Sequence, residues 1–445
     1  MQEVDTVITG GVVLTLDERD TRIEGGAVAI KGDTIMGVGR AEELRQEFVG
    51  RTLIEAEDSL IMPGLINGHT HAAMTCFRGM ADDMELTTWL NDYIFPAEAK
   101  HADAELAYWG SLLACAEMIK SGTTTFCDMY IFEDETARAA KEAGVRCLLG
   151  EGLLGFPSPN APTSAEGLAC ARRLIEKWQG DSLVNIMVEP HSLYICSPSL
   201  LIKAKELADE YHIPYGLHLL ENQAEQRQLQ ERLGKKPLWF LKEIGYLTER
   251  FLAYHCVFMD EEDIGLFAEH GCRVIHDPES NMKLASGVAP VPAMLKAGIT
   301  VGLGTDGCAS NNNLDMFQEM DTAAKLHKVH NLDPTVMAAG TVLRMATCEG
   351  AKALGLGEKT GTLTVGKKAD VIIIDLNKPH LTPLYNEYSH LVYAVSGADV
   401  DTVLINGQLV MRKRRLLTID EREVMTQVRN IASGIKKTLT ARTQA

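Results

Sequence analysis

The middle of the sequence alternates short apolar runs with stretches of helical periodicity, and this alternation limits the possible folds most. Apolar runs typical of buried strands cover residues 60–66, 123–129, 146–150, 184–189, 215–220, 251–257, 273–276 and 299–304. Helix-period segments lie between them, for example at 102–120, 133–143, 164–178, 199–211 and 260–270. Eight strand–helix units over roughly 300 residues predict an α/β fold, a (β/α)8 TIM-type barrel. An open doubly wound sheet is the alternative, because periodicity does not report whether a sheet closes.

Both ends of the chain are rich in β-structure signals. Residues 6–16 are typical of two strands around a Gly-Gly turn, and residues 26–39 are typical of a hairpin that turns at 31–33. Similar apolar runs return at 361–375 and 403–410. Two separated β-rich ends join most simply in one small β-sandwich. We therefore predict that segments 1–57 and 361–445 form this sandwich, the second with a C-terminal helix, and that the barrel, 58–360, is inserted between them.

The composition excludes several classes of protein. With 46% hydrophobic and 23% charged residues, the chain is not intrinsically disordered. Its net charge of −18 disfavours binding to nucleic acid or to an anionic membrane surface. The ten cysteines form no C-x-x-C pair, which favours buried, reduced thiols. The sequence has no basic leader and no apolar stretch near the ~20 residues that span a bilayer. We expect a cytoplasmic protein.

The candidate functional residues follow the ends of the predicted strands, where the sites of (β/α)8 barrels lie. Five of the 13 histidines fall at such ends, and an aspartate follows the last strand: His69, His71, His191, His218, His255 and Asp306. In His69-x-His71 both rings project to the same side of an extended chain. With His218 and Asp306 they form a nitrogen and oxygen donor set suited to zinc or iron(II), with one position left for water. We predict that these four residues bind a metal.

Two further residues are placed to move protons beside this metal. Glu221 follows His218 by three residues, which suits a carboxylate next to the attacking water, although a carboxylate at a helix start is the structural alternative. His255 could orient the same water, and its alternative is a buried core histidine. A metal or purine-binding protein without catalysis is the competing class. The presence of both Glu221 and His255 argues against it.

Several motifs along the chain resemble those of the amidohydrolase superfamily, and specifically of the 5-methylthioadenosine/S-adenosylhomocysteine deaminases. They cover residues 62–71, 190–192, 218–221, 253–257, 281–287, 303–307 and 361–370. The resemblance implies hydrolytic deamination of 5′-methylthioadenosine and S-adenosylhomocysteine, with adenosine a further candidate, to inosine analogues and ammonia by a metal-bound hydroxide. The implied partner is thus a small-molecule nucleoside. Whether the chain forms a homo-oligomer is left open.

The resemblance also assigns roles to residues. It implies one Zn²⁺ per subunit, or Fe²⁺ in its place, held by His69, His71, His218 and Asp306. The implied catalytic residues are Glu221, His255 and Asp306. The implied substrate contacts are Trp89, Glu98, His191, Glu221 and Asp306, where Glu98 would hold the ribose hydroxyls and Trp89 would line the nucleoside pocket. Residues 184–189 contain no lysine to bridge a second metal, which supports a single ion.

One position departs from the family pattern. Some relatives carry an arginine at the end of the third strand that can reach the homocysteine carboxylate, and this chain has Glu151 there. Arg172 or Arg173 on the next helix could take its place. The departure favours methylthioadenosine over S-adenosylhomocysteine. A free-nucleobase deaminase or an s-triazine hydrolase on the same metal site is the alternative function. The Glu98 carboxylate distinguishes a nucleoside deaminase from both, because only a nucleoside has ribose hydroxyls.

Overall fold

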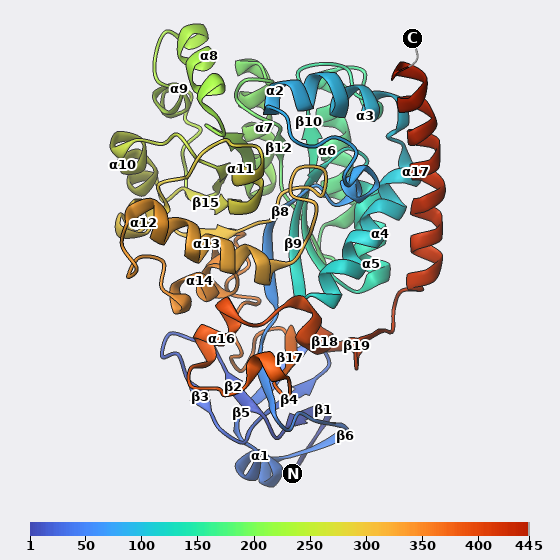
Figure 1. The fold of residues 1–445 in the computed structure, drawn as a ribbon, viewed down its shortest axis with the longest axis vertical. Coiled ribbons are helices and arrows are strands. Elements are labelled where there is room, and N and C mark those ends of the chain that lie inside the picture. The colour runs from blue at the N-terminus through green and yellow to red at the C-terminus, as the bar shows by residue number, and fades with distance from the viewer. Residues whose placement is uncertain (444–445) are drawn as a thin grey trace.

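The β-rich ends of the chain lie together, at the lower end of the molecule in Figure 1. The structure is a computed structural model that describes residues 1–443, so the last two residues of the predicted segment 361–445 lie outside the described part. One sheet has four strands in the order β5-β4-β1-β6, and a second has seven in the order β20-β19-β18-β17-β7-β2-β3. Their bounds are β1 Gln2–Thr9, β2 Val12–Leu14, β3 Arg22–Ile23, β4 Gly26–Lys31, β5 Thr34–Arg40, β6 Phe48–Glu55, β7 Ser59–Pro63, β17 Val371–Asp375, β18 Val400–Ile405, β19 Gln408–Arg412 and β20 Arg415–Leu416.

One hydrophobic cluster joins these two sheets. Ile8 and Val28 from the four-stranded sheet are buried together with Ile61, Val371 and Leu404 from the seven-stranded sheet. Both inner faces are apolar because side chains alternate along each strand. The N-terminal and C-terminal segments therefore share one core, as a sandwich requires.

The predicted first strand of the barrel, 60–66, is wrong as a single element. Its first half is β7, which pairs with β17 and β2 inside the seven-stranded sheet. Its second half begins β8 (Leu65–Thr70), which pairs with β9 (Thr123–Tyr130) instead. Gly64 separates the two at a point where an added Cβ would lie 2.1 Å from the Thr124 side chain. Two buried strands in succession give one continuous apolar run, so hydrophobicity alone could not divide them. The division at 57/58 and 360/361 stays a prediction.

The larger region alternates parallel strands with helices, which confirms the predicted α/β class. The order β11-β10-β9-β8 forms one sheet, in which β12 also pairs with β10, and β13-β14-β15-β16 forms another. The further strands are β10 Arg146–Leu153, β11 Val184–Ile186, β12 Glu189–Pro190, β13 Tyr215–Leu219, β14 Phe251–His255, β15 Arg273–His276 and β16 Val301–Leu303. Almost every residue of these strands is buried, as expected for parallel strands covered by helices.

Helices occupy the predicted intervals between the strands. The helices at these positions are α4 Ala104–Lys120, α5 Glu133–Ala143, α6 Ser164–Trp178, α7 Pro198–Tyr211 and α10 Glu261–His270. Others are α1 Ala41–Glu47, α2 Leu86–Thr88, α3 Phe95–His101, α8 Gln223–Leu233, α9 Pro237–Glu243, α11 Pro278–Lys283, α12 Val291–Lys296, α13 Met316–Asn331, α14 Ala339–Met345, α15 Cys348–Ala353 and α16 Glu387–Tyr393. The side chains of Asp103, Thr163 and Ser197 accept N–H bonds at the starts of α4, α6 and α7, which explains why these helices begin there.

The two parallel sheets touch at both pairs of edges. On one side, Val188 bridges to Tyr215 and Ser192 bridges to His218, both in parallel register. On the other side, the Asp306 N–H donates to the His69 carbonyl at 3.0 Å. Gly304 permits this approach, because a Cβ there would lie 2.7 Å from the His69 nitrogen. The ladders themselves remain two separate sheets.

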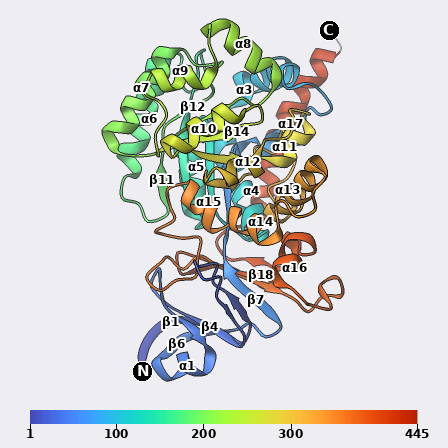
Figure 2. The ribbon, with the colours of Figure 1, turned by 90° about the vertical axis from the view of Figure 1, so that its left-hand side faces the viewer.

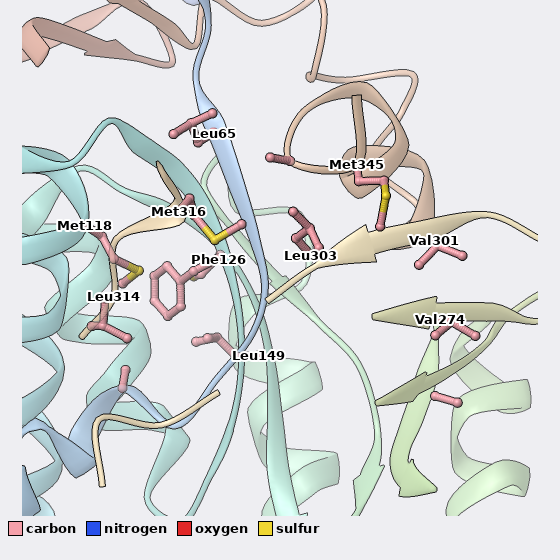
Figure 3. Packing of buried hydrophobic residues seen from close by; sticks show 14 of the residues in the cluster. Leu65, Met118, Phe126, Leu149, Val274, Val301, Leu303, Leu314, Met316 and Met345 are labelled. Atoms are coloured by element: carbon pink, nitrogen blue, oxygen red, sulfur yellow. The ribbon is translucent and has the colours of Figure 1, made fainter. Parts of the chain in front are cut away.

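The core of the larger region lies between the strands and the surrounding helices. Figure 3 shows Leu65 on β8 among Phe126, Met316 and Leu303, which belong to one buried cluster. The two views agree that this region lies on one end of the sandwich (Figure 1 and Figure 2).

A long C-terminal helix, α17 (Glu421–Thr443), runs along the flank of the larger region beside α4 (Figure 1). Its inner face carries Val428 and Ile435, which are buried in a hydrophobic cluster of the larger region. Neither this helix nor any other within residues 1–443 combines the length and the apolar character needed to cross a membrane. All ten cysteines carry free thiols and nine are buried, as predicted.

Candidate metal and nucleoside site

The structure brings the four predicted metal ligands together. His69 lies in β8 and His71 directly follows it, while His218 lies in β13 and Asp306 comes three residues after β16. His71 Nε2 lies 3.1 Å from Asp306 Oδ1, and His69 Nε2 lies 3.7 Å from the same oxygen. The ring centroids of His69 and His218 are 4.9 Å apart. The chain enters β8 from the sandwich, so this cluster faces the opposite end, where α2, α3 and α8 lie in Figure 1.

His255 belongs to the same cluster of donor atoms. One group of donors within 4.8 Å of one another comprises His69, His71 and Asp306, and a second comprises His69, His218 and His255. The groups share His69, which places it at the centre of five converging side chains.

Backbone carbonyls orient two of the imidazoles. His71 Nδ1 hydrogen-bonds the Met129 carbonyl, and His218 Nδ1 hydrogen-bonds the His191 carbonyl at 2.6 Å. A carbonyl only accepts, so each Nδ1 donates to it and each Nε2 faces the cluster. His218 is neutral and presents a lone pair there. Burial lowers the pKa of His71, but Asp306 beside its Nε2 outweighs burial and raises that pKa to about 9. This arrangement is typical of histidines that ligate a metal.

His69 gives the sharpest indication that the cluster fits a cation. Its ring is buried and stacks on Tyr254 at a centroid distance of 3.9 Å. Neither ring nitrogen has a hydrogen-bond partner among the described residues. Burial lowers the pKa of His69 and of His218 well below the usual value, which leaves neutral imidazoles. A buried nitrogen without a partner is costly, and a divalent cation at Nε2 would satisfy it.

Hydroxyl groups fix the orientation of Asp306. Its Oδ2 accepts hydrogen bonds from Ser280 Oγ at 2.6 Å and from Ser310 Oγ at 2.8 Å. Its Oδ1 accepts the Gly307 N–H at 2.7 Å and faces the histidines. Burial alone would raise the pKa of Asp306, but the hydrogen bond and charge of His71 hold it well below the usual value. The carboxylate is therefore ionised and aimed at the cluster.

The two predicted proton-transfer residues also face this cluster. Glu221 is buried beyond the end of β13, and burial together with Asp306 and Glu225 raises its pKa well above the usual value. His255 ends β14 with a φ of +67°. Its Nδ1 lies 3.0 Å from Asn281 Oδ1 and 3.4 Å from Asp277 Oδ2. Both partners accept, so Nδ1 donates and Nε2 is left to act as an acceptor.

A cavity of about 930 Å³, measured out to its open mouth, connects these groups to the predicted substrate contacts. Trp89, Glu98 and His191 line it together with His71, His218, Glu221, His255 and Asp306. The Trp89 indole N–H is held by the Ala81 carbonyl at 3.1 Å. His191 stacks on His218 at 4.6 Å, and burial lowers its pKa to about 3. The predicted residues therefore share one concave, mostly apolar site.

Glu98 is the acidic group of this cavity that lies on a helix. It lies on α3, and burial raises its pKa to about 7, although the nearby Tyr130 hydroxyl opposes the rise. The Tyr130 hydroxyl is itself buried and lacks a hydrogen bond of good geometry to any described residue. A carboxyl and a phenol side by side in an apolar wall form a site for polar groups of a ligand.

No lysine or arginine is among the described residues that line the cavity. Glu151 does not line it either, although its position on β10 suggested that it would face the substrate. Arg172 makes a two-pronged ion pair with Glu210 at 2.6 and 2.7 Å on the surface, and Arg173 contacts Cys170 Sγ at 3.0 Å. Neither arginine replaces the missing cation.

The sequence reasoning missed the residues that hold the site in place. Ser280, Ser310 and Asp277 support Asp306 and His255, and Glu225 supports Glu221. Tyr254 stacks on His69 and donates its hydroxyl to the buried Glu189. Two signals were available: Tyr254 lies in the motif at 253–257, and Glu225 follows Glu221 by four residues.

Comparisons with known proteins agree with this geometry. The model of the Amidohydrolase family matches residues 60–410. The chain is 64% identical to 5-methylthioadenosine/S-adenosylhomocysteine deaminase 1 of Syntrophus aciditrophicus (strain SB), over 99% of each. It is 45% identical to 5′-deoxyadenosine deaminase of Methanosarcina barkeri (strain Fusaro / DSM 804), over 97% of this chain and 98% of that one.

A solved structure is also similar over nearly the whole chain. It is an adenosine deaminase from Xanthomonas campestris with bound zinc, 36% identical, with a TM-score of 0.96 over 98% of this chain and 99% of that one. The resemblance inferred from the motifs is thus confirmed: the chain belongs to the amidohydrolase family.

Proposed function

We propose that this protein is a metal-dependent deaminase that hydrolyses 5′-substituted adenosines to the inosine analogues and ammonia. The observation that carries the proposal is one cavity that contains both the histidine–aspartate cluster and Glu98. The first can activate water, and the second can bind a ribose. The relatives named as methylthioadenosine, S-adenosylhomocysteine and 5′-deoxyadenosine deaminases support the same reaction.

The scaffold for this reaction is, we infer, one closed (β/α)8 barrel. The bridges from Val188 to Tyr215 and from Ser192 to His218 join the two parallel sheets on one side. The hydrogen bond from Asp306 to His69 joins them on the other. Closure explains why ligands from β8, β13 and the segment after β16 meet in one place, since all barrel strands end on the same face.

His69, His71, His218 and Asp306 are the residues that would hold one zinc ion, with iron(II) as the alternative. Three imidazoles and a carboxylate are a donor set typical of catalytic sites for either ion. The zinc in the similar Xanthomonas campestris structure supports this choice. When bound, such an ion lowers the pKa of water toward ~7 and so makes it a nucleophile at neutral pH.

The protein's own groups would then move the protons. Glu221 takes a proton from the attacking water and delivers it to N1 of the purine as oxygen adds at C6. Its pKa, which burial raises well above the usual value, suits this role, because a more basic carboxylate takes a proton from water more readily. His255 Nε2 and Asp306 orient the water by accepting from it. His255 and Asp306 take the second proton of the water from the new C6 oxygen, this proton passes to the 6-amino group, and the C–N bond breaks to release ammonia and leave a C6 carbonyl.

Glu98 would accept hydrogen bonds from the ribose hydroxyls, and Trp89 and His191 would line the nucleoside. A carboxylate forms stronger hydrogen bonds to hydroxyls than a neutral acceptor does. A free-nucleobase deaminase or an s-triazine hydrolase has no use for this group. The position of Glu98 within the cavity therefore favours a nucleoside over both alternatives.

The wall beyond the ribose favours a neutral 5′-substituent. It includes Leu154, Phe156, Pro157 and Ile131 and carries no cation among the described residues. A methyl or methylthio group gains from burial there, at roughly 25 cal/mol per Å². The homocysteine carboxylate would instead lose water without gaining a partner. We expect methylthioadenosine and 5′-deoxyadenosine to be better substrates than S-adenosylhomocysteine.

A deamination panel followed by the change in purine absorbance tests this function. It compares methylthioadenosine, 5′-deoxyadenosine, S-adenosylhomocysteine, adenosine, adenine, guanine and a chloro-triazine. We expect turnover of the 5′-substituted nucleosides, and turnover of guanine or the triazine without nucleoside activity would overturn the substrate assignment. Metal analysis of the same preparation tests the single ion, because two tightly bound ions per chain would contradict it.

A further inference from the structure

Glu151 lies on β10 with its side chain turned away from the cavity and is only 4% exposed. Its Oε1 accepts the Phe132 N–H and its Oε2 accepts the Glu133 N–H, each at 3.1 Å. The Asn160 side-chain amide also donates to Oε1. One buried carboxylate thus binds two loops, the turn after β9 and the loop after β10.

The first of these loops has an unusual backbone at its contact with Glu151. Phe132 has a φ of +63°, a left-handed conformation that residues with a Cβ rarely adopt. Two successive N–H groups then point the same way, which forms a cradle for an anion. Glu151 fills this cradle, and the preceding Tyr130 and Ile131 line the cavity as a result.

Hydrogen bonds at Asn160 and Ser158 and a close backbone contact at Gly155 fix the second loop. Asn160 Oδ1 accepts from Ser158 Oγ at 2.9 Å, and Ser158 pairs with Ala161 through two backbone hydrogen bonds of 3.0 and 3.1 Å. Gly155 passes so close to Ile195 that an added Cβ would lie 2.2 Å from its carbonyl oxygen. Residues 156–159 between these contacts line the cavity.

The two loops form the apolar end of the cavity together with α3. The Phe156 ring meets the Phe95 ring edge to face at 5.2 Å. Phe156 is nevertheless 38% exposed, so packing by itself leaves this aromatic wall partly open. The polar contacts of Glu151 and Asn160 supply the remaining constraint on its position.

We propose that Glu151 is a positioning residue that determines which 5′-substituents the enzyme accepts, by holding both loops of the apolar wall through Phe132, Glu133 and Asn160. The inference rests on the proposed function, since it concerns the 5′-end of the same nucleoside. Glu151 touches neither substrate nor metal cluster. It acts by keeping a neutral wall where the 5′-group ends, so its loss weakens binding of long 5′-groups and leaves the chemistry at C6 intact.

The test compares Glu151→Ala and Asn160→Ala with wild type on two substrates. Methylthioadenosine reaches the wall, and 5′-deoxyadenosine lacks the whole methylthio group. We expect Glu151→Ala to raise KM for methylthioadenosine about tenfold with kcat nearly unchanged, because misplacement of a binding wall affects mainly uniform binding. The KM for 5′-deoxyadenosine should rise less than about threefold on the same reasoning. Asn160→Ala frees one loop only and should act in the same direction with a smaller effect.

The control is Glu166→Ala, which removes an exposed carboxylate at the start of α6, close to the same loop. It should leave both substrates unaffected. General destabilisation would lower kcat for the two substrates equally and leave their KM ratio unchanged, so the ratio separates positioning from folding. If Glu151→Ala fails to fold, the KM ratio of the two substrates in Asn160→Ala tests the proposal instead.

An unchanged KM ratio in both variants would overturn the role of Glu151 and leave the proposed function standing. A wild-type enzyme that deaminates no 5′-substituted adenosine would instead overturn the proposed function itself. The failure of this inference and the failure of the proposed function therefore show up in different measurements.

Discussion

Glu225 holds the backbone of Glu221: its Oε2 accepts the Glu221 N–H at 2.7 Å, and its Oε1 accepts the Leu220 N–H at 3.3 Å. Leu220 has a φ of +52°, so the chain turns sharply at the end of β13. Glu225 is buried, and Asn222 starts its helix by accepting the Glu225 N–H. The position of the Glu221 carboxyl in the cavity therefore depends on a residue that does not itself line the cavity.

We expect Glu225→Gln to lower kcat about tenfold or more with little change in KM. A glutamine can accept only one of the two N–H bonds and presents its own N–H group to the other, which shifts the turn that carries Glu221. Steady-state kinetics on methylthioadenosine measures both parameters. Glu231→Gln, on the exposed face of the same helix, is the control. Equal activity in the two variants would contradict this role.

Replacing the proton shuttle itself should cost more. Glu221→Gln keeps the shape of the side chain but cannot take a proton from water, and general acid–base catalysis is typically worth about 10²- to 10⁴-fold. We expect kcat to fall by at least that factor while the metal content, measured by elemental analysis, stays at the wild-type level. Near-normal turnover would remove Glu221 from the mechanism.

The sequence predicted the helices closely because their ends carry local signals. The expected segment 133–143 coincides with α5, which ends at Gly144 with a φ of +76°. The strands were harder, since β7 and β8 form one apolar run although they belong to different sheets. No local pattern distinguishes a strand that ends a sandwich from one that begins a barrel.

The candidate site likewise contains some residues that the sequence predicts and others that it does not. The donor set was predictable because His69 and His71 lie two residues apart at the end of one strand and the other donors lie at the ends of later strands. Ser310 and Asp277 were not, because each reaches the site from a loop whose path depends on tertiary packing. Glu151 was expected near the substrate from its strand position, and only the structure places its carboxylate behind the wall. The cytoplasmic location and the absence of nucleic-acid and membrane partners stay predictions from charge and pattern.

A buried ion pair joins the two regions of the molecule. Arg146, at the start of β10, contacts Asp370, just before β17, at 2.8 and 3.1 Å, and it also donates to the Ser182 carbonyl and to Asn406. We expect Arg146→Ala to lower the free energy of unfolding by about 3–5 kcal/mol, because it leaves the Asp370 charge buried without its partner. Denaturant unfolding measures the loss.

The exposed pair of Lys141 with Asp181 provides the comparison. Lys141→Ala should change the free energy of unfolding by no more than about 1 kcal/mol, since solvent screens that pair. A loss of similar size in both variants would show that the buried pair does not fasten the sandwich to the barrel.

Glu98 makes nucleoside binding depend on pH. Its burial raises the pKa to about 7, so the carboxylate that accepts from ribose hydroxyls is formed only as the pH rises through that value. The KM for methylthioadenosine should therefore fall by up to about tenfold in total between about pH 6 and pH 8, as expected for one ionising carboxyl. Glu98→Gln should abolish this dependence and raise KM at pH 8, because a neutral amide accepts more weakly than a carboxylate. Adenine, which has no ribose, is the control substrate. If its KM followed the same pH profile, or if Glu98→Gln retained the profile, the titrating group would have to be another residue.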